Sequence, residues 1–424
     1  MGEILQSIIE LEQKLLKDKC ELIFLMSFGH TGIDWLHSLL DGHEQIFIMP
    51  QFSFYRSWKL LEANKITNVD EMTLLWVNDF NSDVVQSNDD SKKFNDDSEV
   101  LIFKRKLHQY LSTYGIKKDS VLWGIHEAYR CSKGFNKDYK VIVVQEHAPY
   151  AFDKIINDFS NSKILMIIRD PRASLAGFYK GLNKKFPIGK HDIYNYFFNM
   201  STEQWLFSSE MYYKYKASLK DNLFIVKNEK MVSSLFTEMT LISQWLGVGF
   251  SETMLIGSNP NKSICTPDSC YLDRGEQPED INKYYLPANV RSRWLGELSD
   301  KEINMIEQLL YRIMTDFSYK PINNRNFYNI ILSYFSFIHP HRGCDRFRFY
   351  KPTKNELLRK EDLLIYKANP ILRYIFKFLP IWGKVAYIYL STILMQINIL
   401  FDKDRWKRYD DPVLDKIYRK LMVK

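Results

Sequence analysis

The amino-acid sequence predicts an α/β fold, with a parallel central sheet flanked by helices and a mostly helical C-terminal extension. Four apolar runs of strand length carry this prediction, because strands buried on both faces of a parallel sheet are apolar throughout. They occupy residues 22–26, 140–144, 164–168 and 223–226. Segments with helical spacing alternate with these runs, as in sheets with right-handed crossovers. A composition of 46% apolar and 26% charged residues excludes a wholly disordered or collagen-like chain.

The first half of the chain opens with a predicted amphipathic helix over residues 4–18, ahead of the first strand. A glycine-containing break at 27–32 follows that strand, and helical spacing resumes over 33–40. Residues 81–99 are polar, acidic and short of apolar side chains, which predicts a mobile surface loop at about 81–99.

The second half contains two further predicted helices. Residues 235–246 form one, closed by Gly247, because glycine readily adopts the left-handed conformation of a C-cap. Residues 299–317 form the other, in which Ser299 and Glu302 have the spacing of a capping box. We therefore expect one α/β domain over 1–320 and an extension over 321–424.

Cysteine usage and the first residues predict a reducing, cytoplasmic setting. The five cysteines are odd in number and include no Cys-x-x-Cys pair, which argues against a disulfide framework and a structural zinc site. The first twenty residues carry glutamates and lack a long apolar run, unlike a signal peptide.

The C-terminal extension is basic and aromatic. Residues 321–424 hold 20 Lys and Arg against 9 Asp and Glu, whereas the rest of the chain is mildly acidic. Such a segment attracts nucleic acid, anionic lipid or an acidic partner, or is merely solvated. Its apolar stretch at 371–401 has three interpretations: helices packed on the catalytic domain, an interfacial membrane anchor, or a true span. We expect peripheral contact with an anionic membrane surface and no nucleic acid.

Two motifs follow predicted strands and suit anion binding. Gly29-His-Thr-Gly32 lies between a strand and a helix, where unpaired N–H groups at the helix N-terminus bind phosphate well. It lacks the Gly-Lys-Ser/Thr of a Walker A loop, and a plain tight turn is its other interpretation. Arg169-Asp-Pro-Arg172 ends the strand at 164–168, where two arginines suit bidentate anion binding. Its other interpretation is a salt bridge that holds the following helix.

Together these motifs resemble the sulfotransferase family. The resemblance runs in family order over about residues 20–320, and its segments are 24–43 with Leu-Leu-Asp-Gly-His at 39–43, Gln-Glu-His-Ala-Pro at 145–149, 164–179, 226–232, Trp-Leu-Gly-Val at 245–248, and Trp294 with the helix after Ser299. The resemblance implies a P-loop-like fold, of the sulfotransferase and nucleotide-kinase kind. It also implies 3′-phosphoadenosine-5′-phosphosulfate (PAPS) as co-substrate.

The resemblance further implies which residues bind the donor. These are Gly29, His30, Thr31, Gly32, Ile33 and Asp34 in the first element, and Arg169, Arg172 and Ser174 in the second. Several positions depart from the family pattern, among them His147, which stands where many members carry a lysine. His30 stands where the family has an arginine or lysine, Asp34 adds a negative charge beside the expected phosphate, and Gly177 stands where a serine is expected, for which Ser174 is the nearby substitute.

Sulfuryl transfer needs a base for the acceptor hydroxyl and donors that stabilise charge on the sulfuryl and phosphate oxygens. His147 fits the base best because histidine titrates near neutrality, and Glu146 is the next candidate. His30 is the third catalytic candidate, at the sulfonate. His126 and Glu127 are further possible bases, whereas Gln51 stands where some relatives carry a catalytic glutamate. No metal site is expected.

The predicted function is a sulfotransferase acting on a hydroxyl of a saccharide or a lipid-linked glycan. An alternative is a sulfotransferase-like fold that binds nucleotide or glycan without catalysis, which His30 and Gln51 favour. A third interpretation is another anion-binding α/β enzyme, such as a kinase or glycosyltransferase, against which the missing Walker lysine counts.

Overall fold

The computed structural model describes the part of the chain that forms the sheet and its neighbouring helices. These residues are 15–50, 66–82, 96–146, 151–177, 207–256 and 294–326, together with 54, 55, 58, 62, 94, 205, 328 and 329. The described residues fall into two compact units, and each is treated by itself. The first unit comprises those up to residue 177, residues 205–211 and those between 215 and 297; the second comprises residues 212–214 and those from Leu298 on.

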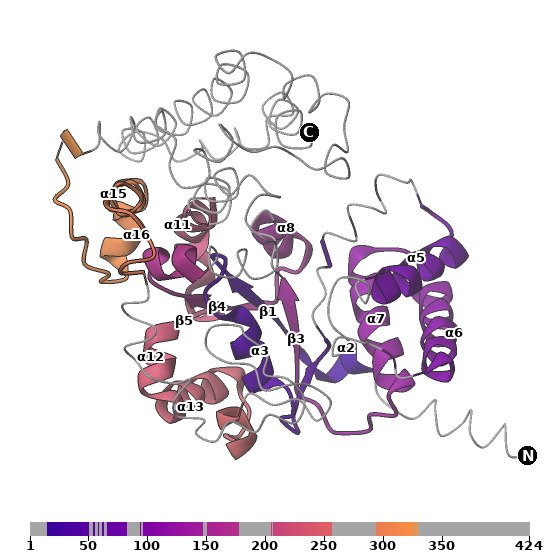
Figure 1. Cartoon of the computed structure of the whole chain (residues 1–424). Coiled ribbons are helices and arrows are strands. Elements are labelled where there is room, and N and C mark those ends of the chain that lie inside the picture. Colours follow the sequence, from indigo (N-terminus) through magenta and orange to yellow (C-terminus); the bar gives the residue numbers. More distant parts are fainter. Residues whose placement is uncertain are drawn as a thin grey trace, which may run out of the picture. The chain divides into compact units, whose positions relative to one another are not determined.

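The first unit is built on a five-stranded parallel sheet (Figure 1). Its strands are β1 (Glu21–Ser27), β2 (Ile46–Ile48), β3 (Val141–Glu146), β4 (Lys163–Ile168) and β5 (Leu223–Lys227), in the order β2-β3-β1-β4-β5. The predicted α/β class and all four predicted strands are confirmed. The sequence does not predict β2, because its three residues are too few to stand out as an apolar run.

The strand register brings three chain segments to one edge of the sheet. Ser27 at the end of β1 pairs with Ile167 of β4, and Met26 pairs with Glu146 at the end of β3. The strands are parallel, so the segments that follow β1, β3 and β4 all leave from the same edge. Ligands of open parallel sheets bind outside this carboxyl edge.

Helices cover both faces of the sheet. On one face lie α3 (Ile33–Leu40), α12 (Asn228–Ser233) and α13 (Leu235–Leu246), whose apolar side chains join Ile23 and Leu25 of β1 in one core (Figure 1). The opposite face carries Phe24, whose ring lies 5.4 Å from that of Phe159, just after α8 (Ala151–Asp158). The predicted helices at 33–40 and 235–246 are confirmed, and Gly247 has the left-handed conformation expected of a C-cap.

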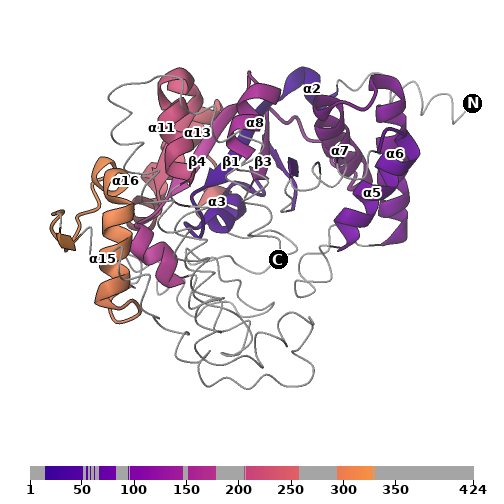
Figure 2. The ribbon, with the colours of Figure 1, turned by 90° about the horizontal axis from the view of Figure 1, so that it is seen from above.

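Three helices gather beyond the β3 side of the sheet, as Figures 1 and 2 both show. They are α5 (Val69–Ser82), α6 (Asp97–Tyr114) and α7 (Lys118–Ser132). The loop predicted at about 81–99 is helical at its described ends, because α5 runs to Ser82 and Asp96 caps the first turn of α6. The remaining elements of this unit are α2 (Leu16–Lys19), α11 (Phe207–Leu219, with residues 212–214 in the second unit), η4 (Lys220–Asn222) and η5 (Glu252–Leu255).

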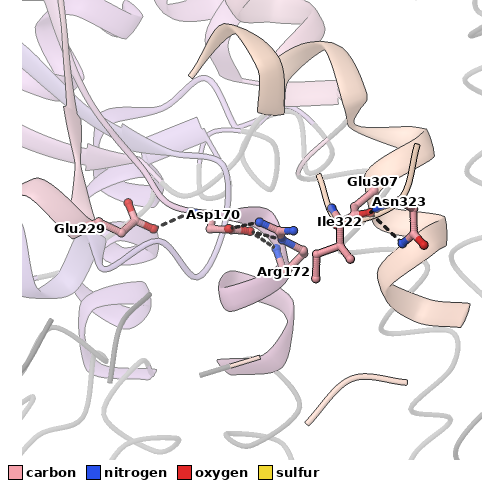
Figure 3. Close-up of polar contacts among 6 residues, drawn as sticks. All are labelled: Asp170, Arg172, Glu229, Glu307, Ile322 and Asn323. Carbon is pink, nitrogen blue, oxygen red and sulfur yellow. Dashed lines mark hydrogen bonds and ion pairs between the residues drawn. The ribbon is translucent and has the colours of Figure 1, made fainter. Parts of the chain in front are cut away.

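The second unit contains α15 (Asp300–Leu309) and α16 (Tyr311–Asp316). The capping box of Ser299 and Glu302 is present, but the single helix predicted over 299–317 is wrong. Leu310 leaves the helical conformation, at φ −104° and ψ 18°, and separates α15 from α16. The buried Glu307 carboxylate accepts N–H donors from Ile322 and Asn323 at 2.9 and 2.8 Å, which fastens the segment after α16 to α15 (Figure 3).

Several predicted features lie outside the described residues. Among them are most of the helix over 4–18, Gln51, most of the loop at 81–99, His147 and the apolar stretch at 371–401. The division into a domain over 1–320 and an extension over 321–424 therefore stays a prediction. Within the described part, no helix is both long and apolar enough to cross a membrane.

Close packing of α6 against α7 depends on Gly124, which yields the first prediction. A Cβ at this position lies 2.9 Å from the Tyr110 ring and 3.2 Å from Leu107. Gly124→Ala should therefore lower the free energy of unfolding by about 1–3 kcal/mol, the usual cost of overpacking. Urea unfolding measures this. Gly249→Ala is the matched control, because a Cβ there meets nothing within 4 Å, and an equal effect of both substitutions contradicts the packing argument.

Candidate functional site

The loop between β1 and α3 has an unusual backbone. Gly29, His30 and Gly32 have φ values of 99°, 49° and 95°, in the left-handed region that glycine tolerates and histidine rarely adopts. Gly32 is also the N-cap of α3, and no side chain caps the helix there. The first N–H groups of any α-helix have no acceptor within the helix, so the N-terminus of α3 suits an anion.

Three side-chain hydrogen bonds hold this loop in place. Thr31 Oγ1 donates to the carbonyl of Ile167 in β4 at 2.9 Å, and Asn228 Nδ2 of α12 donates to the carbonyl of Thr31 at 2.9 Å. Ser174 Oγ donates to the carbonyl of Gly29 at 2.5 Å. The loop that follows β1 is thereby tied to the segments that follow β4 and β5.

Ser174 contacts both the loop after β1 and an indole ring. Its side chain is buried; besides donating to Gly29, its Oγ accepts the indole N–H of Trp205 at 3.2 Å. Ser174 therefore helps to hold the loop through the carbonyl of Gly29. Its contact with a phosphate stays a prediction.

The turn after β4 concentrates charge at the carboxyl edge. Arg169 is the first residue beyond the strand and is only 2% exposed. The backbone N–H of Asp170 donates to Glu229 Oε1 of α12 at 2.8 Å (Figure 3). Burial raises the pKa of the Glu229 carboxyl, and this hydrogen bond and the positive charge of Arg169 offset part of the rise. A buried guanidinium requires nearby anions, and Glu229 belongs to its surroundings.

Arg172 is held within the same turn. Its Nε and Nη2 donate to the two carboxylate oxygens of Asp170 at 3.0 and 2.7 Å (Figure 3). Its guanidinium carbon lies 4.4 Å from the centre of the Trp294 ring, a distance that favours cation–π attraction. The structure thus shows for Arg172 the salt bridge that was the other interpretation of the motif. Its binding of phosphate stays a prediction.

The β3 side of the loop carries carboxylates and amides. Gln145 Nε2 donates to Asp34 Oδ1 at 2.7 Å, so the extra negative charge of α3 is turned toward β3. Glu146 is fully buried, and its Oε2 accepts the backbone N–H of Tyr55 at 3.1 Å. Through this hydrogen bond Glu146 holds the backbone at Tyr55. His147, one residue later, lies outside the described residues.

The two further possible bases lie elsewhere. His126 and Glu127 belong to α7, which packs beside β2 and not at the carboxyl edge; the His126 ring contacts Phe47 of β2 at 6.1 Å. Burial lowers the pKa of His126 to about 4, so this histidine is neutral at pH 7. Glu127 forms a buried ion pair with Arg130 and accepts the backbone N–H of Leu16. Both residues serve the packing of α7.

Sequence reasoning missed the three residues that fix this geometry: Asn228, Glu229 and Gln145. The segment at 226–232 had been matched to the family, but nothing in its pattern shows that Asn228 reaches the first loop and Glu229 the Arg169 turn. Gln145 and Asp34 are separated by 111 residues, so only the β1–β3 register brings them together.

The described arrangement suits two anions on neighbouring strands. One place is the uncapped N-terminus of α3 with its glycine loop, and the other is Arg169 beyond β4. Because β1 and β4 are adjacent strands, the two places lie beside each other at the carboxyl edge of the sheet. Among the described residues, no group of three or more His, Cys, Asp or Glu side chains is arranged to hold a metal ion.

Comparison with known proteins gives one family match. A model of the sulfotransferase family matches residues 23–252, more than half of the 424-residue chain. No curated protein matches the chain significantly.

Solved structures of low similarity were also found. The sulfotransferase domain from the curacin biosynthetic pathway has a TM-score of 0.38 and 13% identity, and the match covers 71% of this chain and 98% of that one. The sulfotransferase domain of the Synechococcus PCC 7002 olefin synthase has a TM-score of 0.36 and 13% identity, covering 68% and 91%. Mouse sulfotransferase SULT7A1 complexed with PAP has a TM-score of 0.35 and 13% identity, covering 74% and 88%.

Proposed function

Because the chain belongs to the sulfotransferase family, we propose that it moves a sulfuryl group from PAPS to a hydroxyl group. The observation that carries the proposal is the pairing of two anion-binding elements after the adjacent strands β1 and β4. The loop at 29–32 with the N-terminus of α3 suits the 5′-phosphosulfate, and Arg169 suits the 3′-phosphate. Ile33 and Asp34 supply further backbone N–H groups in the first turn of α3.

PAPS supplies an activated sulfuryl group, bonded to the oxygen of its 5′-phosphate. In the proposed reaction the acceptor oxygen forms a bond to sulfur, the bond between sulfur and that phosphate oxygen breaks, and its electron pair stays on the phosphate. The proton of the acceptor hydroxyl must go to a base on the protein. In this proposal the backbone N–H groups of the loop and of α3 stabilise the leaving phosphate.

The strand order supports a proposed place for the acceptor. Arg169 follows β4 and the glycine loop follows β1, so a donor that binds both points its sulfuryl end away from β4, toward β3. The segment after β3 carries Glu146 and His147. Since Glu146 is buried and engaged by Tyr55, we assign the proton transfer to His147. His30, which is exposed in the loop, is assigned to the sulfonate oxygens.

The acceptor class is a saccharide or a lipid-linked glycan. The support for it is the 15% content of aromatic residues, since aromatic rings stack on sugars. The alternative function is nucleotide or glycan binding without catalysis. It is favoured by His30, which stands where the family has an arginine or lysine, and by Gln51, which stands where some relatives carry a catalytic glutamate. We further propose that the basic residues 321–424 bring the protein to an anionic membrane surface.

Loss of Arg169 should weaken nucleotide binding. The product analogue 3′-phosphoadenosine 5′-phosphate, here PAP, should bind the parent protein, and Arg169→Ala should lose about 1.5–3 kcal/mol, hence at least about tenfold in affinity. Isothermal titration calorimetry measures both. Arg105→Ala on α6 is the matched control, because Arg105 is exposed and far along the chain from the site. Equal affinities of the parent and Arg169→Ala remove Arg169 from the site.

Loss of His147 should affect turnover and spare nucleotide binding. General acid–base assistance contributes about 10²–10⁴-fold, so His147→Gln should lower transfer of labelled sulfate from PAPS to a panel of saccharides by that factor. PAP affinity should stay at the parent value. If His147→Gln turns over within a few-fold of the parent, another residue accepts the proton. If the parent itself transfers no sulfate, the alternative function is favoured.

The basic tail should bind anionic vesicles. Each Lys or Arg near such a surface contributes about 1 kcal/mol, and salt screens the attraction. The full chain should therefore float with anionic liposomes at low salt and much less at high salt. Replacing Lys403, Arg405, Lys407 and Arg408 with glutamine should weaken flotation, and neutral liposomes are the control. A full chain that stays unbound at low salt refutes the membrane proposal.

A further inference from the structure

Ser174 lies in the interior of the protein, between the loop after β1 and the ring of Trp205. It belongs to the helical segment 171–177 that follows the turn after β4, and its side chain is fully buried. Trp205 is also fully buried, and its ring meets that of Phe28 edge to face at 5.3 Å, directly before Gly29. The contacts of Ser174 with the indole and with the loop are therefore shielded from water.

The two hydrogen bonds of Ser174 can run in only one direction. The indole N–H of Trp205 donates and cannot accept, so it occupies a lone pair of Ser174 Oγ, at 3.2 Å. The carbonyl of Gly29 accepts and cannot donate, so the single hydroxyl proton of Ser174 is directed to it, at 2.5 Å. The proton that this serine could offer to a phosphate is thus already used within the protein.

These hydrogen bonds set the orientation of the peptide between Gly29 and His30. The peptide is planar and trans, so its C=O and its N–H point in opposite directions. Because the carbonyl is turned toward the buried Ser174, the N–H of His30 is directed the other way. Gly29 has a φ of 99° and the backbone freedom of glycine, so its own sequence does not fix this orientation. Ser174 does so from outside the loop.

The orientation of this peptide matters to an anion, because a carbonyl oxygen repels it and an N–H group attracts it. Loops of this kind bind phosphate when their N–H groups face the ligand. The next carbonyl but one is held in the same manner, since Asn228 Nδ2 donates to the carbonyl of Thr31 at 2.9 Å. Side chains from outside the loop thus occupy both carbonyls, and rotation of either peptide would bring an oxygen toward the ligand side.

We infer that Ser174, held by Trp205, is a positioning residue that keeps the Gly29 carbonyl turned away from the 5′-phosphate of the nucleotide, and that Ser174 does not itself bind the 3′-phosphate. The inference rests on the proposed function, because it needs a nucleotide whose 5′ end lies on the loop after β1. It departs from the family resemblance, which implies that Ser174 contacts the donor beside Arg169. The two assignments predict opposite dependence on the ligand.

Three nucleotides separate these assignments in calorimetric titrations of the full chain. Adenosine 5′-monophosphate carries only the phosphate proposed for the loop, adenosine 3′-monophosphate carries only the one proposed for Arg169, and PAP carries both. Ser174→Ala should bind the 5′-monophosphate and PAP about five- to tenfold more weakly, which is the bias that one hydrogen bond gives. It should bind the 3′-monophosphate as tightly as the parent does. Displacement of PAP measures the two monophosphates.

Two further variants control the experiment. Trp205→Phe keeps an aromatic ring beside Phe28 and removes the N–H that directs the Ser174 hydroxyl, so it should show the same ligand dependence with a smaller loss. Ser162→Ala is the matched control. Ser162 is a buried serine whose Oγ also donates to a backbone carbonyl, that of Phe159 at 2.7 Å, but it precedes β4 at the opposite edge of the sheet. Its loss should leave all three affinities unchanged.

The ligand dependence of Ser174→Ala decides the outcome. If it loses affinity for the 3′-monophosphate and PAP and keeps that for the 5′-monophosphate, Ser174 is a phosphate ligand and the inference is overturned. An equal loss with all three nucleotides, or no loss with any, overturns it as well, and PAP binding by the parent then leaves the proposed function intact. Parent affinities in Trp205→Phe overturn the part assigned to Trp205. If the parent binds no PAP, the proposed function and the inference both fall.

Discussion

The structure of the site depends on the hydrogen bonds that the loop between β1 and α3 makes with the segments around it. The chain leaves β1 through left-handed residues that no regular ladder can pair, and polar groups buried in this way must find partners. Thr31 donates to the carbonyl of Ile167, and Ser174 and Asn228 donate to the carbonyls of Gly29 and Thr31. The partners come from β4, from the helical segment after it and from α12. The shape of the loop therefore depends on the segments at the ends of β1, β4 and β5, and not on the sequence of the loop alone.

The sequence predicts the sheet well because burial on both faces makes its strands conspicuous. Residues 164–168 are apolar without interruption, and the structure assigns Lys163–Ile168 to β4. Patterns fail where a single residue decides: nothing in the spacing over 299–317 shows that Leu310 breaks the helix. The two motifs proposed to bind anions could be located because each directly follows a strand. Their supports could not, since Asn228 and Thr31 are 197 residues apart and only the sheet order brings them together.

Charge at the carboxyl edge is more balanced than the motifs suggest. Read along the chain, Arg169-Asp-Pro-Arg172 presents two arginines for an anion. In the structure Arg172 is paired with Asp170 and stacks on Trp294, and Arg169 is buried in the same turn. The neighbouring carboxylates reduce the net positive charge at this edge of the sheet. Recognition at such an edge relies on directed hydrogen bonds and helix termini more than on bulk charge.

Two consecutive residues of α12 serve both halves of the site, and this limits how the sequence can vary in length. Asn228 contacts the loop after β1, and Glu229 contacts the turn after β4. One residue of an α-helix turns the chain by about 100°, so an insertion or deletion at this point misdirects both side chains at once. Loops elsewhere on the domain can lengthen during evolution without such a penalty. The junction of β5 with α12 should therefore keep a constant length among descendants of this gene, even where the residues around it drift.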